Sequence, residues 1–447
     1  MKKPNVIYVF ADQWRAQDIN CAGNKQIISP NIDKLAAESI YFEHAVSSMP
    51  CCCPYRGTLM TGQYPVTHGV FINDVPLVTE AETLADVFNT AGYQTAYVGK
   101  WHIDGQGRSN YIPPERRHGF YDYWKVLECT HDYNDSFYYE GDSDEKKEWP
   151  GYDAIEQTKD FIQYIESLNN DQPFLGVLSW GPPHAPYLTA PQKYQDMYNA
   201  DDIILRDNVP DHIADDARMN LAGYYAHITA LDDCVADLLA CLEKKGIANN
   251  TIFVLTSDHG DMMGSHGQYK KQRPLAESVR VPFMLRWPDK YGREGRTVSS
   301  IIDSPDIMPT LLSLCDLPIP ETVQGCDRST VLGGEEDDAV AFYNCLVPFG
   351  QWTRDMNGKE CRGILSKRYT YVADLEGPWL LYDNETDPYQ MTNLINQESV
   401  GDIQQKMDQQ LREKLIELGD EFREAEFHLD AWNYSYDKET LTVPFTY

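Results

Sequence analysis

From Val6 to about Leu312, short apolar runs alternate with longer segments in which apolar residues recur at helical spacing. Short apolar runs followed by polar or Gly/Pro-rich turns are typical of buried strands. The predicted strands are residues 6–10, 95–98, 174–178 and 252–255. Helical periods fill residues 84–91 and 155–165, and a long amphipathic segment, residues 219–245, ends at Gly246, where a helix C-cap is expected. This alternation predicts an α/β protein with a large mixed, mainly parallel central sheet flanked by helices.

The pattern changes after Gly333 and Gly334, where an acidic run precedes strand-like segments that have no helices between them. These segments, residues 363–365, 369–372 and 380–382, come before a helical period at residues 403–418. A small C-terminal antiparallel sheet with one helix is the structure that this order predicts. We therefore expect a catalytic α/β domain at residues 1–335 and a small α+β subdomain at residues 336–447.

Composition narrows the classes of partner. The 447 residues are 42% hydrophobic and 24% charged, as in a globular protein, and the formal net charge is -31. Such an acidic chain is repelled by phosphate backbones and anionic membranes, so we expect neither nucleic acid nor membrane as a partner. No apolar run is long enough to span a bilayer, and Asp12 interrupts the first one too early for a signal peptide. The chain as written is expected to be cytoplasmic, or periplasmic if a leader has been removed. Its eleven cysteines form no disulfide framework.

Polar residues follow each of the four predicted strands. They are Asp12 and Gln13, then Lys100 and His102, then His184, and finally Asp258 and His259. Any one of them can be an ordinary loop residue or helix cap. Ligands of open α/β sheets, however, bind beyond the carboxyl ends of the strands, so four such ends together predict one site.

A second candidate is the segment from Met49 to Gly62, which contains Cys51, Cys52 and Cys53. A proline near its start and a terminal glycine predict a short helix that displays Cys52 at its N-terminus, where free N–H groups favour an anion. Arg56, one turn later, lies on the same face and offers several donors to an oxyanion. A buried thiol cluster and a metal-binding cysteine group are the alternatives, although consecutive cysteines lack the usual metal-ligand spacing.

These segments resemble the type I sulfatases of the alkaline phosphatase-like superfamily. The family motif C-x-P-x-R-x-x-L/M-x-T-G matches Cys52, Pro54, Arg56, Leu59 or Met60, Thr61 and Gly62. Of the three cysteines, only Cys52 has proline two residues later and arginine four residues later. The resemblance implies that a maturation enzyme oxidises Cys52 to formylglycine.

Other family blocks extend the resemblance almost end to end. The block G-Y-x-T-x-x-x-G-K-W-H is matched by residues 92–102, the block P-H-x-P-Y by residues 183–187, and the late metal block by residues 258–260. Lys271 stands ten residues before Val281-Pro282, as in the family, and residues 381–388 are similar to its L-Y-D-L-x-x-D-P element.

The resemblance implies a sulfatase that hydrolyses a sulfate monoester through the formylglycine hydrate. In such a hydrate one hydroxyl attacks sulfur and the other later expels sulfate, which a serine ester could not do. The implied roles of five side chains are these: Arg56 and Lys100 hold the hydrate, His102 assists its proton transfers, His184 contacts sulfate or protonates the leaving oxygen, and Lys271 binds sulfate.

A divalent cation is implied as well, because Asp12 and Asp258 would otherwise face an anionic substrate without compensation. The implied ligands are Asp12, Gln13, residue Cys52 in its oxidised form, Asp258 and His259. The family usually binds calcium, which is our expectation. Gln13 and His259 replace the aspartate and asparagine of many members, and imidazole is an uncommon calcium ligand, so manganese or another divalent ion is the alternative.

Two other functions remain open. A phosphonate or phosphate ester hydrolase of the same superfamily uses the same formylglycine and tolerates the Gln13 and His259 variants. An inactive anion-binding module is the non-enzyme alternative. For the substrate we expect a short or terminal sulfated saccharide, contacted at the pocket rim by Trp352, Arg354 and Arg362 of the small domain.

Overall fold

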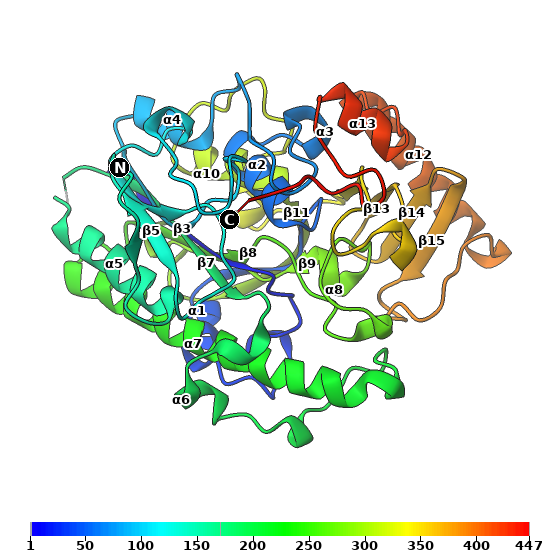
Figure 1. Cartoon of the computed structure of the whole chain (residues 1–447), viewed down its shortest axis with the longest axis horizontal. Helices are drawn as coiled ribbons and strands as arrows, with labels where there is room; N and C mark the ends of the chain where they lie inside the picture. Colours follow the sequence, from blue (N-terminus) through cyan, green and yellow to red (C-terminus); the bar gives the residue numbers. More distant parts are fainter. Residues whose placement is uncertain (1, 170, 447) are drawn as a thin grey trace.

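A mixed sheet forms the centre of the larger part of the molecule (Figure 1). The computed structural model describes residues 2–169 and 171–446, and over these residues the sheet has eleven strands. In spatial order they are β11 (Arg296–Asp303), β2 (Ile40–Val46), β10 (Phe283–Arg286), β8 (Thr251–Ser257), β1 (Asn5–Asp12), β7 (Phe174–Pro183), β3 (Gln94–Lys100), β4 (Tyr123–Leu127), β5 (Phe137–Glu140) and β6 (Lys147–Glu148), while β9 (Arg280–Val281) pairs with β2.

The central strands are parallel, as the sequence predicts. β1 runs parallel to β7 and β8, and β3 runs parallel to β7 and β4. Every residue of β1 is buried because both faces of the sheet are covered. β10 is antiparallel to both β8 and β2, so the predicted mixed, mainly parallel sheet is confirmed.

Helices cover both faces of this sheet. Tyr8 and Phe10 of β1 join one core cluster, and Ile7 and Val9 join the other, because alternate residues of a strand face opposite sides. The helices of the larger part are α1 (Pro30–Ala37), α2 (Cys52–Thr61), α3 (Pro65–His68), α4 (Leu84–Thr90), α5 (Asp153–Ser167), α6 (Gln192–Gln195), α7 (Ala214–Lys245), α8 (Ala276–Val279), α9 (Pro288–Tyr291), α10 (Ile307–Leu314) and α11 (Ser329–Leu332). Side chains of α2, α4 and α10 lie in the first cluster, and those of α1, α5 and α7 lie in the second.

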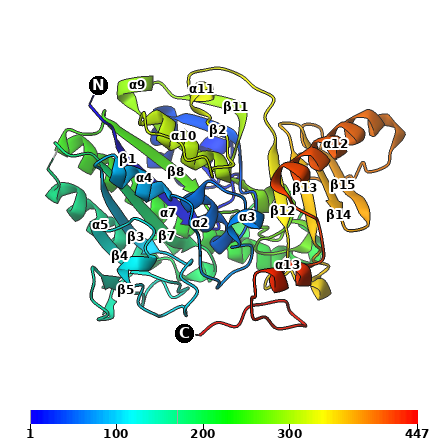
Figure 2. The same ribbon diagram turned by 90° about the horizontal axis from the view of Figure 1, so that it is seen from above.

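A second sheet lies beside the larger part (Figure 2). It is antiparallel and consists of β12 (Ala341–Cys345), β13 (Cys361–Leu365), β14 (Tyr369–Asp374) and β15 (Gly377–Asp383). α12 (Gly401–Leu418) packs on one face through Met407 and Leu411. The small antiparallel sheet with a helix is confirmed, but α13 (Ala425–Ala431) is a further helix that the sequence pattern did not predict.

The chain after α13 returns to the larger part. Leu441 belongs to its core, Tyr434 packs against that core, and the Tyr434 hydroxyl donates a hydrogen bond to the backbone oxygen of Gly69. The domain boundary between residues 335 and 336 stays a prediction. The segment after α13 connects the parts of the chain before and after it, because it follows the small sheet in sequence and packs on the larger part.

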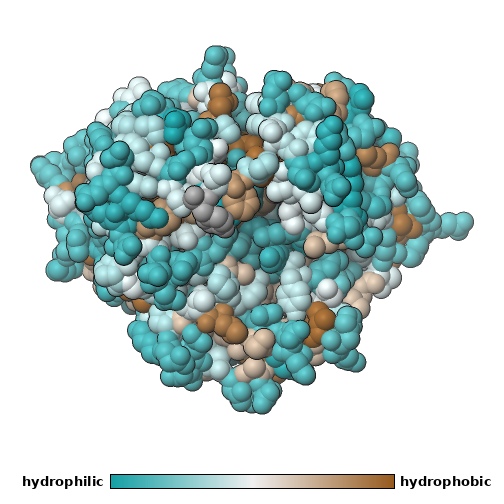
Figure 3. All heavy atoms as spheres, in the orientation of Figure 1, coloured by the Kyte–Doolittle hydropathy of each residue, from teal (hydrophilic) through white to brown (hydrophobic). Residues whose placement is uncertain are grey.

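The surface is mostly hydrophilic on the face shown in Figure 3, with apolar residues scattered in small groups. This agrees with the acidic composition. Across the part of the chain that the structure describes, no helix has both the length and the apolar character needed to cross a bilayer.

Candidate active site

Four adjacent strands end at one edge of the central sheet and carry the predicted polar residues there. β8, β1, β7 and β3 are neighbours in that order. Asp12 and Lys100 are the last residues of β1 and β3, and His184 and Asp258 directly follow β7 and β8. All four side chains are buried. The parallel arrangement therefore gathers two carboxylates, a lysine and a histidine in the interior.

Helix α2 places Cys52 at this edge. Cys51 is its extended N-cap residue, and Gly62 ends it with a φ of 65°, a left-handed conformation that glycine adopts without strain. Cys52 is the first helical residue, so its side chain lies where the helix dipole favours negative charge. Cys52 Sγ lies 2.9 Å from Lys271 Nζ, 3.4 Å from His259 Nε2 and 3.5 Å from Asp12 Oδ1.

The surroundings of Cys52 favour its anion. Burial and the carboxylate of Asp12 would each raise the pKa of the thiol. The ammonium groups of Lys100 and Lys271 outweigh them, so the pKa of Cys52 lies well below its usual value. A position that stabilises a thiolate also suits the oxyanion of any oxygen nucleophile placed there.

Arg56 and Lys100 compensate the acidic groups. Lys100 Nζ donates to Asp12 Oδ2 at 2.6 Å, and one Arg56 nitrogen lies 3.6 Å from a carboxylate oxygen of both Asp12 and Asp258. The other terminal nitrogen of Arg56 donates to Ser179 Oγ at 2.9 Å and to the backbone oxygen of Lys100. Arg56 is thus fixed on one side by the protein and faces the charged cluster on the other.

Asp12, Cys52, Asp258 and His259 could hold a metal ion, because their ligand atoms all lie within 4.8 Å of one another. His259 Nδ1 donates to the backbone oxygen of Gly260 at 2.9 Å, which leaves Nε2 to face the cluster. Burial, together with the charge of Asp12, raises the pKa of Asp258 to about 6. Burial alone would lower the pKa of His259, but the carboxylate of Asp258 raises it to about 9.

Two buried oxygens indicate that a cation fits this cluster. Gln13 Oε1 and Asp258 Oδ2 have no hydrogen-bond partner among the described residues. Gln13 directly follows β1, and its backbone N–H donates to Asp258 Oδ1 at 2.9 Å. A buried oxygen without a hydrogen bond is costly unless a cation satisfies it, as the Arg56 guanidinium 3.6 Å away does in part for Asp258 Oδ2, and oxygen is the ligand type that calcium prefers.

The two predicted histidines are held differently. His102 Nε2 lies 3.3 Å from Asp74 Oδ1, and its buried Nδ1 has no hydrogen-bond partner within the described residues. His184 Nδ1 donates to the backbone oxygen of Ala185 at 2.7 Å, so Nε2 is the ring nitrogen that this bond does not use. Burial, and then the charges of Lys271 and His131, lower the pKa of His184 well below its usual value.

Sequence reasoning missed several residues around the site. His131 stacks on His184, with ring centroids 4.4 Å apart and planes at 20°. Asp74 contacts His102, and Asp261 accepts a hydrogen bond from Gln13. His131 follows β4 closely, so the rule that polar residues after strands mark the site would have found it if β4 had been predicted. Asp261 lies three residues after Asp258, so the same rule of polar residues after strands could have identified it. Asp74 lies in a loop, where the sequence gives no such indication.

The three residues predicted for the pocket rim have different surroundings, and for Trp352 and Arg354 the contact with substrate stays a prediction. The side chain of Arg362 is 0% exposed and forms an ion pair with Asp420, so its predicted position at a rim is wrong. Trp352 is buried and stacks on Trp379, with centroids 6.4 Å apart. Arg354 is exposed, but its guanidinium is bound by the carboxylates of Glu360 and Glu426. The local sequence around these three residues gave no information on their partners, which lie on other segments of the C-terminal part of the chain.

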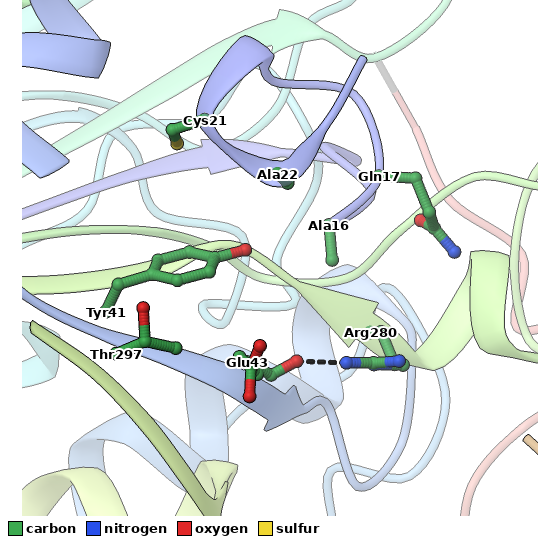
Figure 4. Close-up of a pocket in the computed structure, with 8 residues that line it drawn as sticks. All are labelled: Ala16, Gln17, Cys21, Ala22, Tyr41, Glu43, Arg280 and Thr297. Carbon is green, nitrogen blue, oxygen red and sulfur yellow. Dashed lines mark hydrogen bonds between the residues drawn. The ribbon is translucent and has the colours of Figure 1, made fainter. Parts of the chain in front are cut away.

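A separate hollow lies between the loop after β1 and strands β2, β9 and β11 (Figure 4). Arg280 lies in it and donates a hydrogen bond to the backbone oxygen of Glu43. Of the described residues that line this hollow, none is a predicted site residue. This hollow is therefore separate from the residues gathered around Cys52.

Comparison with known proteins identifies the family of the chain. Residues 4–317 match the sulfatase family model, and residues 264–417 match the model of the C-terminal part of N-sulphoglucosamine sulphohydrolase. The chain is 42% identical to an ulvan-active sulfatase of Formosa agariphila over 99% of this chain and 87% of that protein. The solved structure of the yidJ sulfatase of Bacteroides fragilis superposes with a TM-score of 0.84 and 31% identity, covering 95% of this chain and 97% of that one.

A phosphonate monoester hydrolase of Agrobacterium radiobacter is similar at 22% identity, with a TM-score of 0.73 over 99% of each chain, a likeness that shows the shared fold alone. The alkaline phosphatase-like sheet of this chain carries at its edge a buried thiol, that of Cys52, among lysines and carboxylates. The chain belongs to the sulfatase family and is a sulfuric ester hydrolase.

Proposed function

We propose that the protein hydrolyses sulfate monoesters of carbohydrates through a formylglycine residue made from Cys52, beside a bound divalent cation. The observation that carries this proposal is the position of Cys52. It begins α2, and its Sγ lies 2.9 Å from Lys271 Nζ within the cluster that also contains Asp12, Asp258 and His259. Its oxidation requires the maturation enzyme that sulfatases use.

The hydrate of formylglycine supplies two hydroxyls on one carbon, one to take the sulfuryl group and one to expel sulfate later. Lys100 and Arg56, which both pair with Asp12 beside this residue, would hold the hydrate, and Lys271 lies next to it to bind a sulfate oxygen. These positive groups are in position before the reaction begins, so they stabilise the negative charge that develops on the sulfuryl group. Each such group can raise the rate by a factor of roughly 10² to 10³.

Two histidines handle protons. His184 would act on the substrate through Nε2, because Nδ1 is bound to the backbone oxygen of Ala185. An anionic substrate raises the affinity of this imidazole for a proton, which His184 then gives to the leaving oxygen. His102, which lies 3.3 Å from Asp74, would accept and return the proton of the hydrate.

Asp12, Gln13, oxidised residue 52, Asp258 and His259 would hold the cation, which supplies positive charge beside the nucleophile. Calcium is the proposed ion because carboxylate and amide oxygens dominate this set, and manganese is the alternative because of His259. Elemental analysis of purified protein tests the assignment, and a transition metal in stoichiometric amount would contradict calcium.

A carbohydrate substrate is supported by the relative with 42% identity, which is an ulvan-active sulfatase. We propose a short or terminal sulfated saccharide. The net charge of -31 disfavours the approach of long polyanions, although salt screens this effect beyond about 8 Å. Release of sulfate from oligosaccharides of increasing length tests this, and faster turnover of the longest chains would contradict it.

The rival activity is tested directly with matched aryl esters. We expect protein with oxidised Cys52 to hydrolyse an aryl sulfate faster than the corresponding aryl phosphonate, and Cys52→Ala to lose both activities. A clear preference for the phosphonate would overturn the proposed chemistry. Gln13 and His259 are the residues that give this rival its support.

A further inference from the structure

Gln13 is held in a fixed position by its backbone. Its φ of 73° is left-handed, a conformation that costs energy for a residue other than glycine. Its N–H donates to Asp258 Oδ1 at 2.9 Å, and its carbonyl oxygen accepts a hydrogen bond from the Tyr224 hydroxyl at 2.6 Å. The backbone of Gln13 is thus bound to Asp258, one of the residues that could hold the metal ion.

The amide group of Gln13 is then held by one end only. Nε2 donates to Asp261 Oδ2 at 2.6 Å and to the Tyr187 hydroxyl at 3.4 Å. Oε1 is buried and has no hydrogen-bond partner among the described residues. The two ends of the amide therefore have opposite surroundings.

Asp261 is surrounded by donors. Its Oδ1 accepts from the backbone N–H groups of Met263 and Lys270, each at 2.9 Å, and its Oδ2 accepts from Tyr187 at 2.6 Å as well as from Gln13. Both oxygens of this buried carboxylate therefore act as acceptors. A carboxylate in this position selects the NH₂ end of a neighbouring amide and turns the oxygen away.

We infer that Asp261, supported by Tyr187, is a positioning residue that orients the Gln13 amide so that Oε1 faces the cation. This rests on the proposed cation site. This role explains how Gln13 can occupy a position where many sulfatases have an acidic ligand. Either oxygen of a carboxylate can face a cation, whereas an amide must be oriented so that its oxygen, and not its NH₂ group, faces the cation. Partners outside the ligand set commonly fix ligand orientation in this manner.

The inference gives an uncommon expectation for Asp261→Asn. The backbone N–H groups of Met263 and Lys270 would hold the asparagine oxygen, so its NH₂ group would face Gln13. The Gln13 amide would then rotate by about 180° so that Nε2 faces the cation. The cation repels the positive end of this NH₂ group. In Gln13→Glu/Asp261→Asn the new carboxylate accepts from Asn and still presents an oxygen to the ion.

Calorimetric titration of chelator-treated protein with Ca²⁺ and with Mn²⁺ tests the inference without using activity. We expect Asp261→Asn to weaken binding by roughly 10-fold to 100-fold, and the double variant to recover most of the loss. Asp160→Asn is the matched control, since Asp160 also accepts from a tyrosine hydroxyl, that of Tyr123 at 2.7 Å, and lies away from the site. Its affinity should equal that of the wild type.

Unchanged affinity in Asp261→Asn, or a double variant as weak as the single one, would overturn the inference while leaving the cation site intact. A wild-type protein that binds neither ion would overturn the cation site itself. If Asp261→Asn does not fold, a crystal structure of the wild type with Ca²⁺ decides. We expect Gln13 Oε1 to contact the ion and Nε2 to donate to Asp261. The reverse orientation of the amide, or no contact between Gln13 and the ion, would refute the inference.

Discussion

Three adjacent thiols differ sharply in their surroundings. Burial raises the pKa of Cys51 and of Cys53, whereas the lysines that face Cys52 outweigh burial and lower its pKa. Cys51 is the N-cap residue of α2, and Cys53 accepts a hydrogen bond from the backbone N–H of Asp74. Of the three thiols, that of Cys52 therefore lies in the charged cluster because of its position at the start of α2. The spacing of the sequence motif identified the same cysteine.

His131 supports His184 by stacking, and its removal should show in turnover more than in binding. We expect His131→Ala to lower kcat on an aryl sulfate by roughly tenfold, because a misplaced imidazole transfers its proton less well. KM should change little. His131→Phe keeps an aromatic ring against His184 and should recover most of kcat. Equal kcat in the alanine variant and the wild type would contradict this role.

Asp153 makes stability depend on pH. Burial raises its pKa to about 8, and one of its carboxylate oxygens has no hydrogen-bond partner within the described residues. The folded protein therefore keeps a proton that the unfolded chain loses near the usual pKa of aspartate, so this group reduces the free energy of unfolding as pH rises from about 4 to about 8.

Asp153→Asn has no such proton to lose, so its stability relative to the wild type should increase by up to about 1.4 kcal/mol for each pH unit in that range. Urea unfolding of both proteins at several pH values measures the difference. A difference that stays constant between pH 5 and pH 8 would contradict the raised pKa of Asp153.

Residues of the site were predictable where the chain itself carries the signal. Asp12 and Lys100 end strands, and His184 and Asp258 directly follow strands, whose apolar runs are plain in the sequence. The error at Arg362 has a different cause, because its partner Asp420 lies 58 residues away and only tertiary packing joins them.

At the scale of single elements, glycine lets β3 and β7 approach closely beside the site. Gly99 precedes Lys100 and has a φ of 104°, and a Cβ there would lie 2.1 Å from the backbone oxygen of Ser179. Ser179 also binds Arg56. The end of β3 therefore fixes Lys100 and, through Ser179, the guanidinium on the other side of the cluster.

Gly99→Ala should lower the free energy of unfolding by roughly 2–4 kcal/mol, because backbone must move to admit the methyl group. Gly92→Ala is the matched control: its φ of 81° is also left-handed, but a Cβ there meets nothing within 4 Å. The control should lose only about 1 kcal/mol, the cost of that conformation. Denaturant unfolding compares the two, and equal losses would show that close approach does not matter at Gly99.

The central strands were predictable as elements, whereas the outer ones were not. β1, β3, β7 and β8 are fully or almost fully buried and read as continuous apolar runs. β2 contains Glu43 and His44 and is partly exposed, so its sequence does not resemble a buried strand. The antiparallel place of β10 between β2 and β8 depends on long-range pairing that local pattern cannot show.

At the scale of the whole molecule, the C-terminal segment reaches the catalytic side. The centre of the Phe445 ring lies 3.5 Å from the Arg108 guanidinium carbon, and the backbone N–H of Arg108 donates to the backbone oxygen of Thr446 at 2.8 Å. Arg108 in turn donates twice to Asp74, which contacts His102. The last part of the chain is thereby connected to a proposed proton-transfer group through three contacts.

Phe445→Ala should lower kcat a few-fold and reduce stability by roughly 0.5–1 kcal/mol, because the cation–π contact that supports Arg108 is lost. Phe427→Ala is the control. Phe427 has almost the same exposure, 38% against 40%, and also packs against an arginine, Arg423, but lies on α13. It should change stability alone, and an equal fall of kcat in both variants would contradict the connection to His102.

The central claim is that residue 52 acts as an aldehyde, and mass spectrometry of the peptide that contains it tests this most directly. In protein purified from its native source, with its turnover of an aryl sulfate measured on the same sample, we expect the thiol sulfur and two hydrogens to be replaced by one oxygen, in proportion to activity. A fully active preparation in which Cys52 remains an unmodified thiol would contradict the account.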